Sequence, residues 1–91
     1  MYELKLFITS DTNRNNADIV DVLNQIFGDN SKEKYSLEII NVLKDPEKAF
    51  QYNVIATPTL QRVEPKPEKR LIGDLTDPGK VRIIIDVVEG N

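Results

Sequence analysis

The chain has 91 residues, a length that suits one compact domain and is short for two. Apolar residues make up 40% and charged residues 30%, a balance typical of a folded domain. There is no cysteine and no histidine, which excludes disulfides, thiol redox chemistry, Cys or His zinc sites and catalysis by imidazole. Twelve basic and fifteen acidic residues give a formal charge of −3, which argues against a general affinity for nucleic acid. No apolar run could span a bilayer and the start lacks the layout of a secretory signal, so we expect a cytoplasmic protein. With the catalytic chemistries above excluded, we expect a binding domain and not an enzyme, with no cofactor and no metal.

The first half of the chain predicts a strand, a helix and a second strand. Apolar and polar residues alternate over residues 2–9, which is the period of a strand. Residues 10–16 are rich in capping side chains, and apolar residues then recur at helical spacing up to Phe27, before Gly28 ends the helix. Residues 35–43 are rich in apolar and β-branched residues and predict the second strand. Because such crossovers are right-handed in ~98% of cases, we expect the two strands to be parallel.

The second half predicts a short helix and two strands. Asp45-Pro46-Glu47 is typical of a helix start, and Phe50 would lie on the buried side of that helix. An extended segment follows and enters a strand near Pro58. Residues 65–69 form a connection punctuated by prolines, and residues 71–74 contain another short extended piece and its end.

The C-terminal segment, residues 80–89, admits two interpretations. As a helix it places Val81, Ile84 and Ile85 on one side, and the preceding Thr76-Asp77-Pro78 favours a capped helix. As a strand it fits the local abundance of β-branched residues. Local sequence leaves both alternatives open.

The order of these elements is similar to that of thioredoxin-like domains. A redox site of that type needs Cys-x-x-Cys at the start of the first helix, so the absence of cysteine excludes it. In such domains the proline that corresponds to Pro58 follows a cis peptide bond. A trans proline is the favoured interpretation of Thr57-Pro58 alone, and its place after the helix makes the cis form a strong alternative.

Two charged groups have both a structural and a functional interpretation. Asp18 and Asp21 lie three residues apart on one helix face and could weakly hold a hard cation, although a solvated helix face is the commoner explanation. Lys66, Lys69 and Arg70 form a basic cluster in an acidic chain. This cluster is either a solubilising turn or a docking point for an acidic partner surface.

Several segments resemble the KaiB family of circadian clock proteins. They are YELKLF at residues 2–7, YSLEIINVLKDP at residues 35–46, IATPTL at residues 55–60, and the prolines 65 and 67 followed by KRLIGDL at residues 69–75. The last two segments together are the most specific part of the resemblance. The similarity extends from Tyr2 to about Val88, nearly the whole chain.

The resemblance implies a non-enzymatic timing protein that binds the hexameric ATPase KaiC on its N-terminal ring. Family members of this kind sequester KaiA or alter signalling by histidine kinases through that complex. The resemblance also implies two folds, a free tetramer or dimer ordered βαββααβ and a KaiC-bound, thioredoxin-like monomer ordered βαβαββα. We expect an α/β domain of the thioredoxin-like order over residues 1–91, with residues 1–45 common to both folds and residues 46–91 switching. Conflicting local signals are how a sequence could keep two packings close in free energy.

Functional residues carry over from the resemblance position by position. Lys5, Lys44 and Arg70 match charged positions used in KaiC docking. The cis-proline and fold-switch region comprises Ala56, Thr57, Pro58, Thr59, Pro65, Pro67, Gly73, Asp74, Ile84 and Asp86.

This chain departs from the family pattern at several positions, among them the helix start, where Asp11-Thr12-Asn13 replaces a Gly-Asn-Thr-Pro-like stretch. Asp18 and Glu38 stand where basic residues are common, and Ile84 stands where the family often has glycine. Two other functions are alternatives: the sensory domain of a histidine kinase that reads KaiC, and a thioredoxin-like domain that kept a ligand groove beside Pro58.

Overall fold

The computed structural model describes residues 1–9 and 13–86, and the side chains of these residues except residues 13–17. Its elements in chain order are β1 (Tyr2–Ile8), α1 (Asn13–Phe27), α2 (Ser31–Lys34), β2 (Tyr35–Asn41), α3 (Pro46–Gln51), β3 (Thr59–Glu64), β4 (Lys69–Ile72) and α4 (Pro78–Ile85). This is the expected βαβαββα order with one extra helical turn, α2, between α1 and β2. In the described part of the chain, no helix is both long and apolar enough to cross a membrane.

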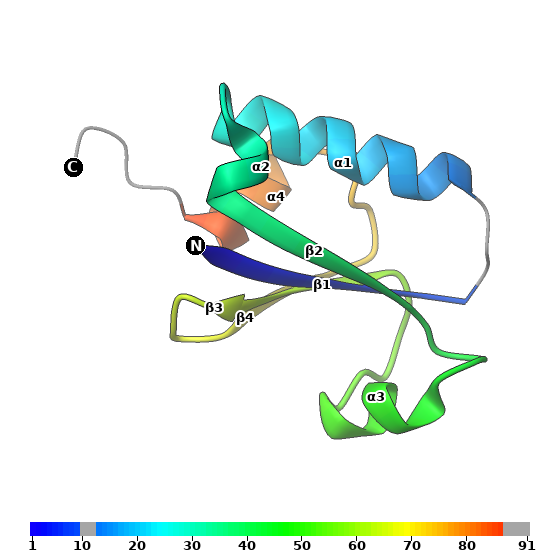
Figure 1. The fold of residues 1–91 in the computed structure, drawn as a ribbon. Helices are drawn as coiled ribbons and strands as arrows, with labels where there is room; N and C mark the ends of the chain where they lie inside the picture. Colours follow the sequence, from blue (N-terminus) through cyan, green and yellow to red (C-terminus); the bar gives the residue numbers. More distant parts are fainter. Residues whose placement is uncertain (10–12, 87–91) are drawn as a thin grey trace.

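The four strands form one sheet in the order β2-β1-β3-β4. β1 and β2 are parallel, as the crossover rule predicts, whereas β3 runs antiparallel to β1 and β4 runs antiparallel to β3. Helices α1 and α4 cover one face of the sheet, and α3 lies on the opposite side at one end of the strands (Figure 1). One face is therefore packed against two helices, whereas α3 lies near one end of the other face.

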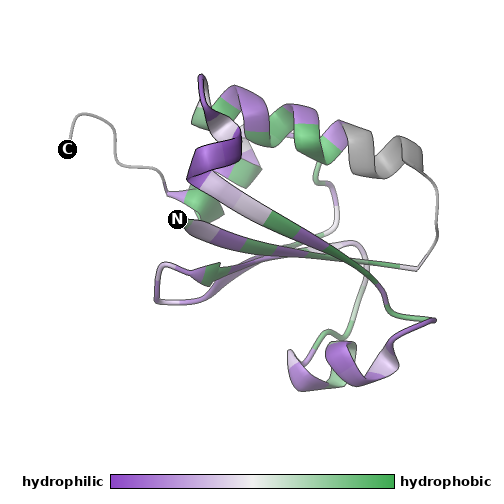
Figure 2. Cartoon of the chain, in the orientation of Figure 1, coloured by the Kyte–Doolittle hydropathy of each residue, from purple (hydrophilic) through white to green (hydrophobic). Residues whose placement is uncertain are grey.

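The core lies between the sheet and the pair α1 and α4. Every second residue of β1 points into it, with Leu4 and Leu6 no more than 2% exposed. Apolar side chains of α1 recur along one side of that helix and meet the strand residues, while polar residues occupy its outer side (Figure 2). The remaining core residues come from β3, the loop after β4 and α4, and they are Leu60, Leu75, Val81, Ile84 and Ile85.

Most local predictions in the second half are confirmed, and one is wrong. The Asp45 carboxylate accepts a hydrogen bond from the amide of Lys48 at 3.4 Å, as a helix cap would. β3 begins at Thr59, directly after Pro58, and the Thr57-Pro58 bond is cis, as are the bonds before Pro65 and Pro67. Phe50, however, is 86% exposed, because α3 extends beyond the sheet instead of packing flat on it.

In this structure the helix α4 includes residues 80–85 of the ambiguous C-terminal segment. Asp77 accepts a hydrogen bond from the amide of Gly79 at 2.9 Å, which caps the first turn. Val81, Ile84 and Ile85 are buried while Ile83 is 71% exposed, the pattern of an amphipathic helix and not of a strand. Asp86 ends the helix with φ 55°, a left-handed conformation, and the rest of the ambiguous segment lies outside the described residues.

A buried arginine ties α4 to the turn between β3 and β4. Arg62 is 3% exposed, and its Nη1 donates to the carbonyl of Ile85 at 2.9 Å while its Nη2 donates to the carbonyl of Pro67 at 2.8 Å. Its Nε is buried without a hydrogen-bond partner among the described residues. The guanidinium thereby satisfies a carbonyl at the C-terminal end of the helix, where a positive charge is also favourable.

We predict that Arg62→Ala lowers the free energy of unfolding by about 2–4 kcal/mol, because it removes packed volume and leaves two carbonyls without their donor. Arg62→Met keeps the apolar stem, so it should cost about half as much. Urea denaturation of the three proteins measures this, with amide exchange in α4 as a local readout. Equal midpoints for the two variants and the unsubstituted protein would show that Arg62 does not hold α4.

Candidate functional site

A row of polar residues crosses the whole sheet on the face away from α1 and α4. Strand register pairs Lys5 of β1 with Glu38 of β2 and with Gln61 of β3, and it pairs Gln61 with Arg70 of β4. Residues paired in register point to the same face, and Lys5 alternates with the core residue Leu4. The row Glu38–Lys5–Gln61–Arg70 is therefore the central feature of the open face.

Glu38 joins two lysines from different elements. Lys5 Nζ and Lys48 Nζ each donate to one carboxylate oxygen of Glu38, and the side chains of Lys5 and Glu38 are 20% and 42% exposed. Hydrogen bonds from Lys48 and Lys5, in that order, lower the pKa of Glu38 to about 2, and the bond to Glu38 raises the pKa of Lys48. The carboxylate thus holds the start of α3 against the strands β1 and β2.

Tyr52, just after α3, packs over the same face. Lys5 Nζ lies 5.4 Å from the centroid of the Tyr52 ring, which is within the range of a cation–π contact. The ring of Phe7, itself fully buried, lies 5.8 Å from that of Tyr52. Tyr52 and Lys48 together anchor both ends of the short helix. Its large apolar residue Phe50 faces solvent and does not contribute to this attachment.

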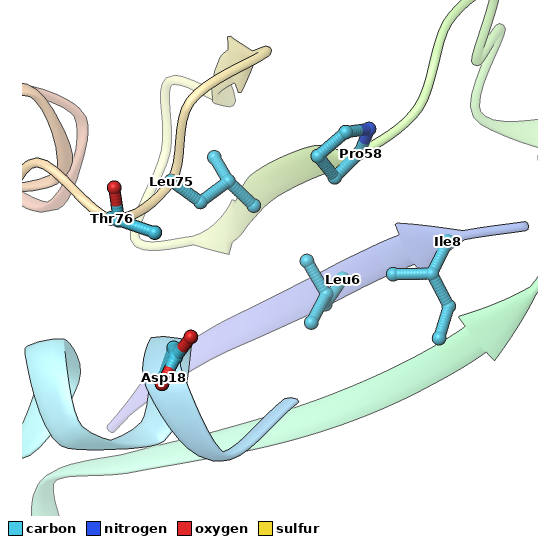
Figure 3. A pocket seen from close by; sticks show the side chains of 6 residues that line it. All are labelled: Leu6, Ile8, Asp18, Pro58, Leu75 and Thr76. Carbon is cyan, nitrogen blue, oxygen red and sulfur yellow. The ribbon is translucent and has the colours of Figure 1, made fainter. Parts of the chain in front are cut away.

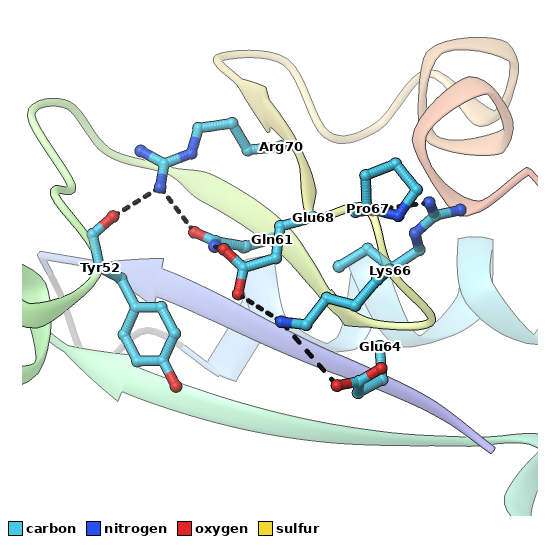
Figure 4. Close-up of polar contacts among 8 residues, drawn as sticks. Tyr52, Gln61, Glu64, Lys66, Pro67, Glu68 and Arg70 are labelled. Carbon is cyan, nitrogen blue, oxygen red and sulfur yellow. Dashed lines mark hydrogen bonds and ion pairs between the residues drawn. The ribbon is translucent and has the colours of Figure 1, made fainter.

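Arg70 uses its guanidinium within the chain. It donates to the backbone carbonyls of Tyr52 at 2.5 Å and Asn53 at 3.0 Å, and to the side-chain oxygen of Gln61 at 2.8 Å. These carbonyls follow the C-terminal end of α3, where a cation is favourable. Figure 4 shows the Arg70 side chain reaching from β4 to Tyr52 and Gln61.

The polar contacts continue from Gln61 to the turn between β3 and β4 (Figure 4). Gln61 Nε2 donates to Glu68 at 3.1 Å, and Glu68 accepts from Lys66 at 2.9 Å. Lys66 also lies 3.8 Å from the carboxylate of Glu64. The hydrogen bond between Lys66 and Glu68 lowers the pKa of Glu68 and raises the pKa of Lys66. Gln61, 2% exposed, has both ends of its amide satisfied.

The structure brings together two of the three docking residues suggested by sequence. Lys5 and Arg70 belong to one row across the sheet, whereas Lys44 is exposed in the turn after β2. The cations of the basic cluster each have a contact within the chain, since Lys66 contacts Glu68 and Lys69 lies 3.4 Å from Asp86 at the end of α4. Its three cations therefore have three separate sets of partners.

The cis-proline segment contacts the turn that follows β4. Thr59 Oγ1 donates to the carbonyl of Ala56 at 2.6 Å, and the amide of Gly73 donates to the carbonyl of Pro58 at 3.0 Å. Gly73 has φ 106°, which side-chain-bearing residues rarely adopt. Asp74 accepts from the amide and hydroxyl of Thr76 at 2.9 and 2.5 Å, and these bonds lower its pKa. Within the predicted cis-proline and fold-switch region, the segment before β3 and the turn after β4 are therefore joined by a backbone hydrogen bond.

Sequence reasoning did not identify several residues of this face. Lys48, Tyr52, Gln61 and Glu68 were not among the candidates, although Gln61 is a polar residue in the middle of a strand and so carried a visible signal. The contacts of Tyr52 and Lys48 depend on where α3 lies. Among the described residues, no group of three or more acidic, histidine or cysteine side chains could hold a metal ion, so Asp18 and Asp21 lack a third ligand there.

We predict a pH-dependent contribution from Glu38. The bonds from Lys48 and Lys5 lower its pKa from 4.5 to about 2, so they stabilise the fold above pH 4.5 and their contribution is lost as pH falls towards 2. Since the Glu38 side chain is 42% exposed, Glu38→Gln should cost only about 1 kcal/mol at neutral pH, and less in high salt.

Urea denaturation between pH 7 and 2 measures the difference between the two proteins, which should shrink below pH 4.5. Glu3→Gln, on the neighbouring strand β1, is the matched control and should show a smaller effect. A difference that stays constant down to pH 2 would contradict this assignment.

Comparison with known proteins places the chain in a family. The model of the KaiB domain matches residues 5–87. The KaiB circadian clock oscillator protein of Rippkaea orientalis is 39% identical over 87 residues, which cover 96% of this chain and 83% of that protein. Its counterpart from Thermosynechococcus vestitus is 40% identical over 87 residues, covering 96% and 80% of the two chains.

Solved structures show the same fold at lower identity. The N-terminal domain of SasA from Synechococcus elongatus aligns with a TM-score of 0.73 and 24% identity over 99% of this chain and 88% of that one. The germline-specific thioredoxin Deadhead of Drosophila melanogaster aligns with a TM-score of 0.66 and 17% identity over 93% of this chain and 78% of its own. The fold is therefore thioredoxin-like, and by its matched domain and its relatives the chain belongs to the KaiB family.

Proposed function

We propose that this protein is a clock or timing protein that binds a KaiC-type hexameric ATPase and modulates its phosphorylation cycle or its output signalling. The observation that carries the proposal is the 39% identity to a circadian clock oscillator protein over 96% of the chain. KaiA-like proteins or histidine kinases would respond to that complex. The role requires a binding surface rather than a catalytic site.

The open face of the sheet is the surface we assign to the ATPase. Its row of charged and amide groups is organised by contacts within the chain, which reduces the ordering cost of binding. Glu38 neutralises Lys5 at a position where relatives often carry a second cation. A partner of this protein therefore meets less positive charge on this face than a partner of those relatives. Lys44, exposed in the turn after β2, then supplies positive charge towards an acidic partner surface.

We predict that the purified protein forms a complex with the KaiC-type ATPase of its own genome after incubation for hours with ATP. Lys44→Glu should weaken the complex by about tenfold, because it places like charge against an acidic surface. Lys32→Glu, an exposed reversal on α2 far from this face, is the control and should bind normally. Size-exclusion chromatography and titration measure both, and the absence of any complex would refute the proposal.

We further propose that the second half of the chain exchanges between two folds and that Ile84 biases the exchange towards the helical one. Ile84 is 6% exposed and packs in the core between α4 and α1, at a position where the family often has glycine. A buried isoleucine adds packing and avoids the loss of helix propensity that glycine brings. A free oligomer of the βαββααβ order would have to remove this side chain from the core.

We predict that Ile84→Gly destabilises the thioredoxin-like fold by about 3–5 kcal/mol, from the cavity and the helix propensity together. Ile83→Gly, one residue earlier and exposed, should cost only about 1 kcal/mol. In the Ile84→Gly protein, backbone NMR shifts should show a second set of signals with extended values for residues 81–85. A single helical set of lower stability would contradict fold exchange.

The sensory domain of a KaiC-reading kinase is the second candidate. Its support is the alignment of 99% of this chain with the SasA domain. The sequence identity of that alignment, 24%, supports a shared fold alone. A sensory domain of this kind would keep α4 helical both free and bound to the ATPase. The same NMR measurement on the free, unsubstituted protein therefore separates the two functions, because a fold-switching protein would show extended values for residues 81–85 before it binds the ATPase.

A further inference from the structure

A pocket lies on the helix-covered side of β1, at the carboxyl end of that strand. Its floor is formed by Leu6 and Ile8 of β1 and by Leu75 of the loop before α4, all three of which are buried. Pro58, Asp18 and Thr76 complete the lining and are exposed. Figure 3 shows these side chains converging from β1, α1, the start of β3 and the loop after β4. The pocket therefore has an apolar interior and a polar mouth.

The size of the pocket limits what it can hold. Its volume is about 70 Å³. This is roughly half of a 150 Å³ apolar cavity that accepts benzene, and far below the ~300–1,000 Å³ of sites that enclose small-molecule ligands. A short unbranched chain of a few carbons fits, whereas a free metabolite would remain mostly outside. The volume favours a side chain that projects from a larger partner.

The mouth of the pocket offers acceptors of hydrogen bonds. Asp18 presents a carboxylate. The hydroxyl of Thr76 donates its hydrogen to Asp74 at 2.5 Å, so its remaining capacity is to accept. An ammonium group has three donors and a positive charge, and it matches this arrangement. An anionic or purely apolar group would leave the Asp18 charge uncompensated.

We propose that this pocket is a second interaction site, which takes a lysine side chain of a partner protein. The four carbons of the lysine stem fill the space between Leu6, Ile8 and Leu75, and the ammonium group binds Asp18 and Thr76. The site is separate from the open face, because Leu6 and Ile8 alternate with Lys5 along β1 and point to the opposite side of the sheet. It follows that both surfaces can be occupied at the same time.

The first test uses peptides of one length and different central side chains. We expect acetyl-Gly-Lys-Gly-amide to shift the amide NMR signals of Leu6, Ile8 and Thr76 with a dissociation constant of about 1–10 mM. The norleucine peptide has the same four-carbon stem without charge, and the glutamate peptide has the opposite charge, so both should bind at least about fivefold more weakly. Signals of Lys5, Gln61 and Arg70 should not move, which separates this site from the proposed ATPase surface.

The second test removes the charge at the mouth. Asp18→Asn should weaken binding of the lysine peptide by about fivefold and leave binding of the norleucine peptide unchanged. Asp21→Asn, also exposed on α1 but outside the pocket lining, is the matched control and should bind like the unsubstituted protein.

Three results would overturn the proposal. One is equal binding of the lysine and norleucine peptides, and another is equal loss in the Asp18 and Asp21 variants. The third is binding of free butylammonium without binding of the lysine peptide, which would assign the pocket to a free amine.

Discussion

The alternation of side chains along β1 is the constraint on which the rest of the structure depends. β1 lies between β2 and β3, so both of its edges are hydrogen-bonded to neighbouring strands. Its even-numbered residues Leu4, Leu6 and Ile8 build the core under α1 and α4. Its odd-numbered residues lie on the other face, where Lys5 belongs to the polar row and Phe7 packs against Tyr52. A shift of one residue in the register of β1 would exchange the two sets and abolish both surfaces.

The two helices of the second half are held in different ways, and α3 depends mainly on polar contacts because it has no buried residue. α3 is held by Lys48 on Glu38 and by Arg70 on the carbonyls after the helix, while Phe50 and Ile55 remain exposed. α4 is held by three buried apolar residues and by the guanidinium of Arg62. A short helix with few buried residues releases little hydrophobic free energy when it packs. This is the physical reason why a second arrangement of residues 46–91 is a reasonable proposal for a member of this family.

Sequence patterns predicted the regular parts of the molecule well and the irregular parts poorly. The strand at residues 2–8 and the helix ending at Phe27 followed from periodicity, because each buries one face. The prediction for Phe50 was wrong because an apolar residue in a short helix indicates burial only if that helix packs flat. For residues 80–89, β-branched residues favoured a strand and the capped start at Thr76-Asp77-Pro78 favoured a helix. The structure shows a helix as far as Ile85, with Ile84 in the core.

Length, composition and the absence of cysteine and histidine by themselves determined that this is a small domain without thiol or imidazole chemistry, and its motifs determined the family. Those properties are local or additive, so no three-dimensional knowledge is needed. Only the tertiary structure decided that Lys5 and Arg70 share one row, that Lys69 is turned towards Asp86, and that Asp18 meets Leu75 at a pocket. These groupings join residues tens of positions apart, and their geometry depends on strand register and on where the helices rest, which no local pattern contains.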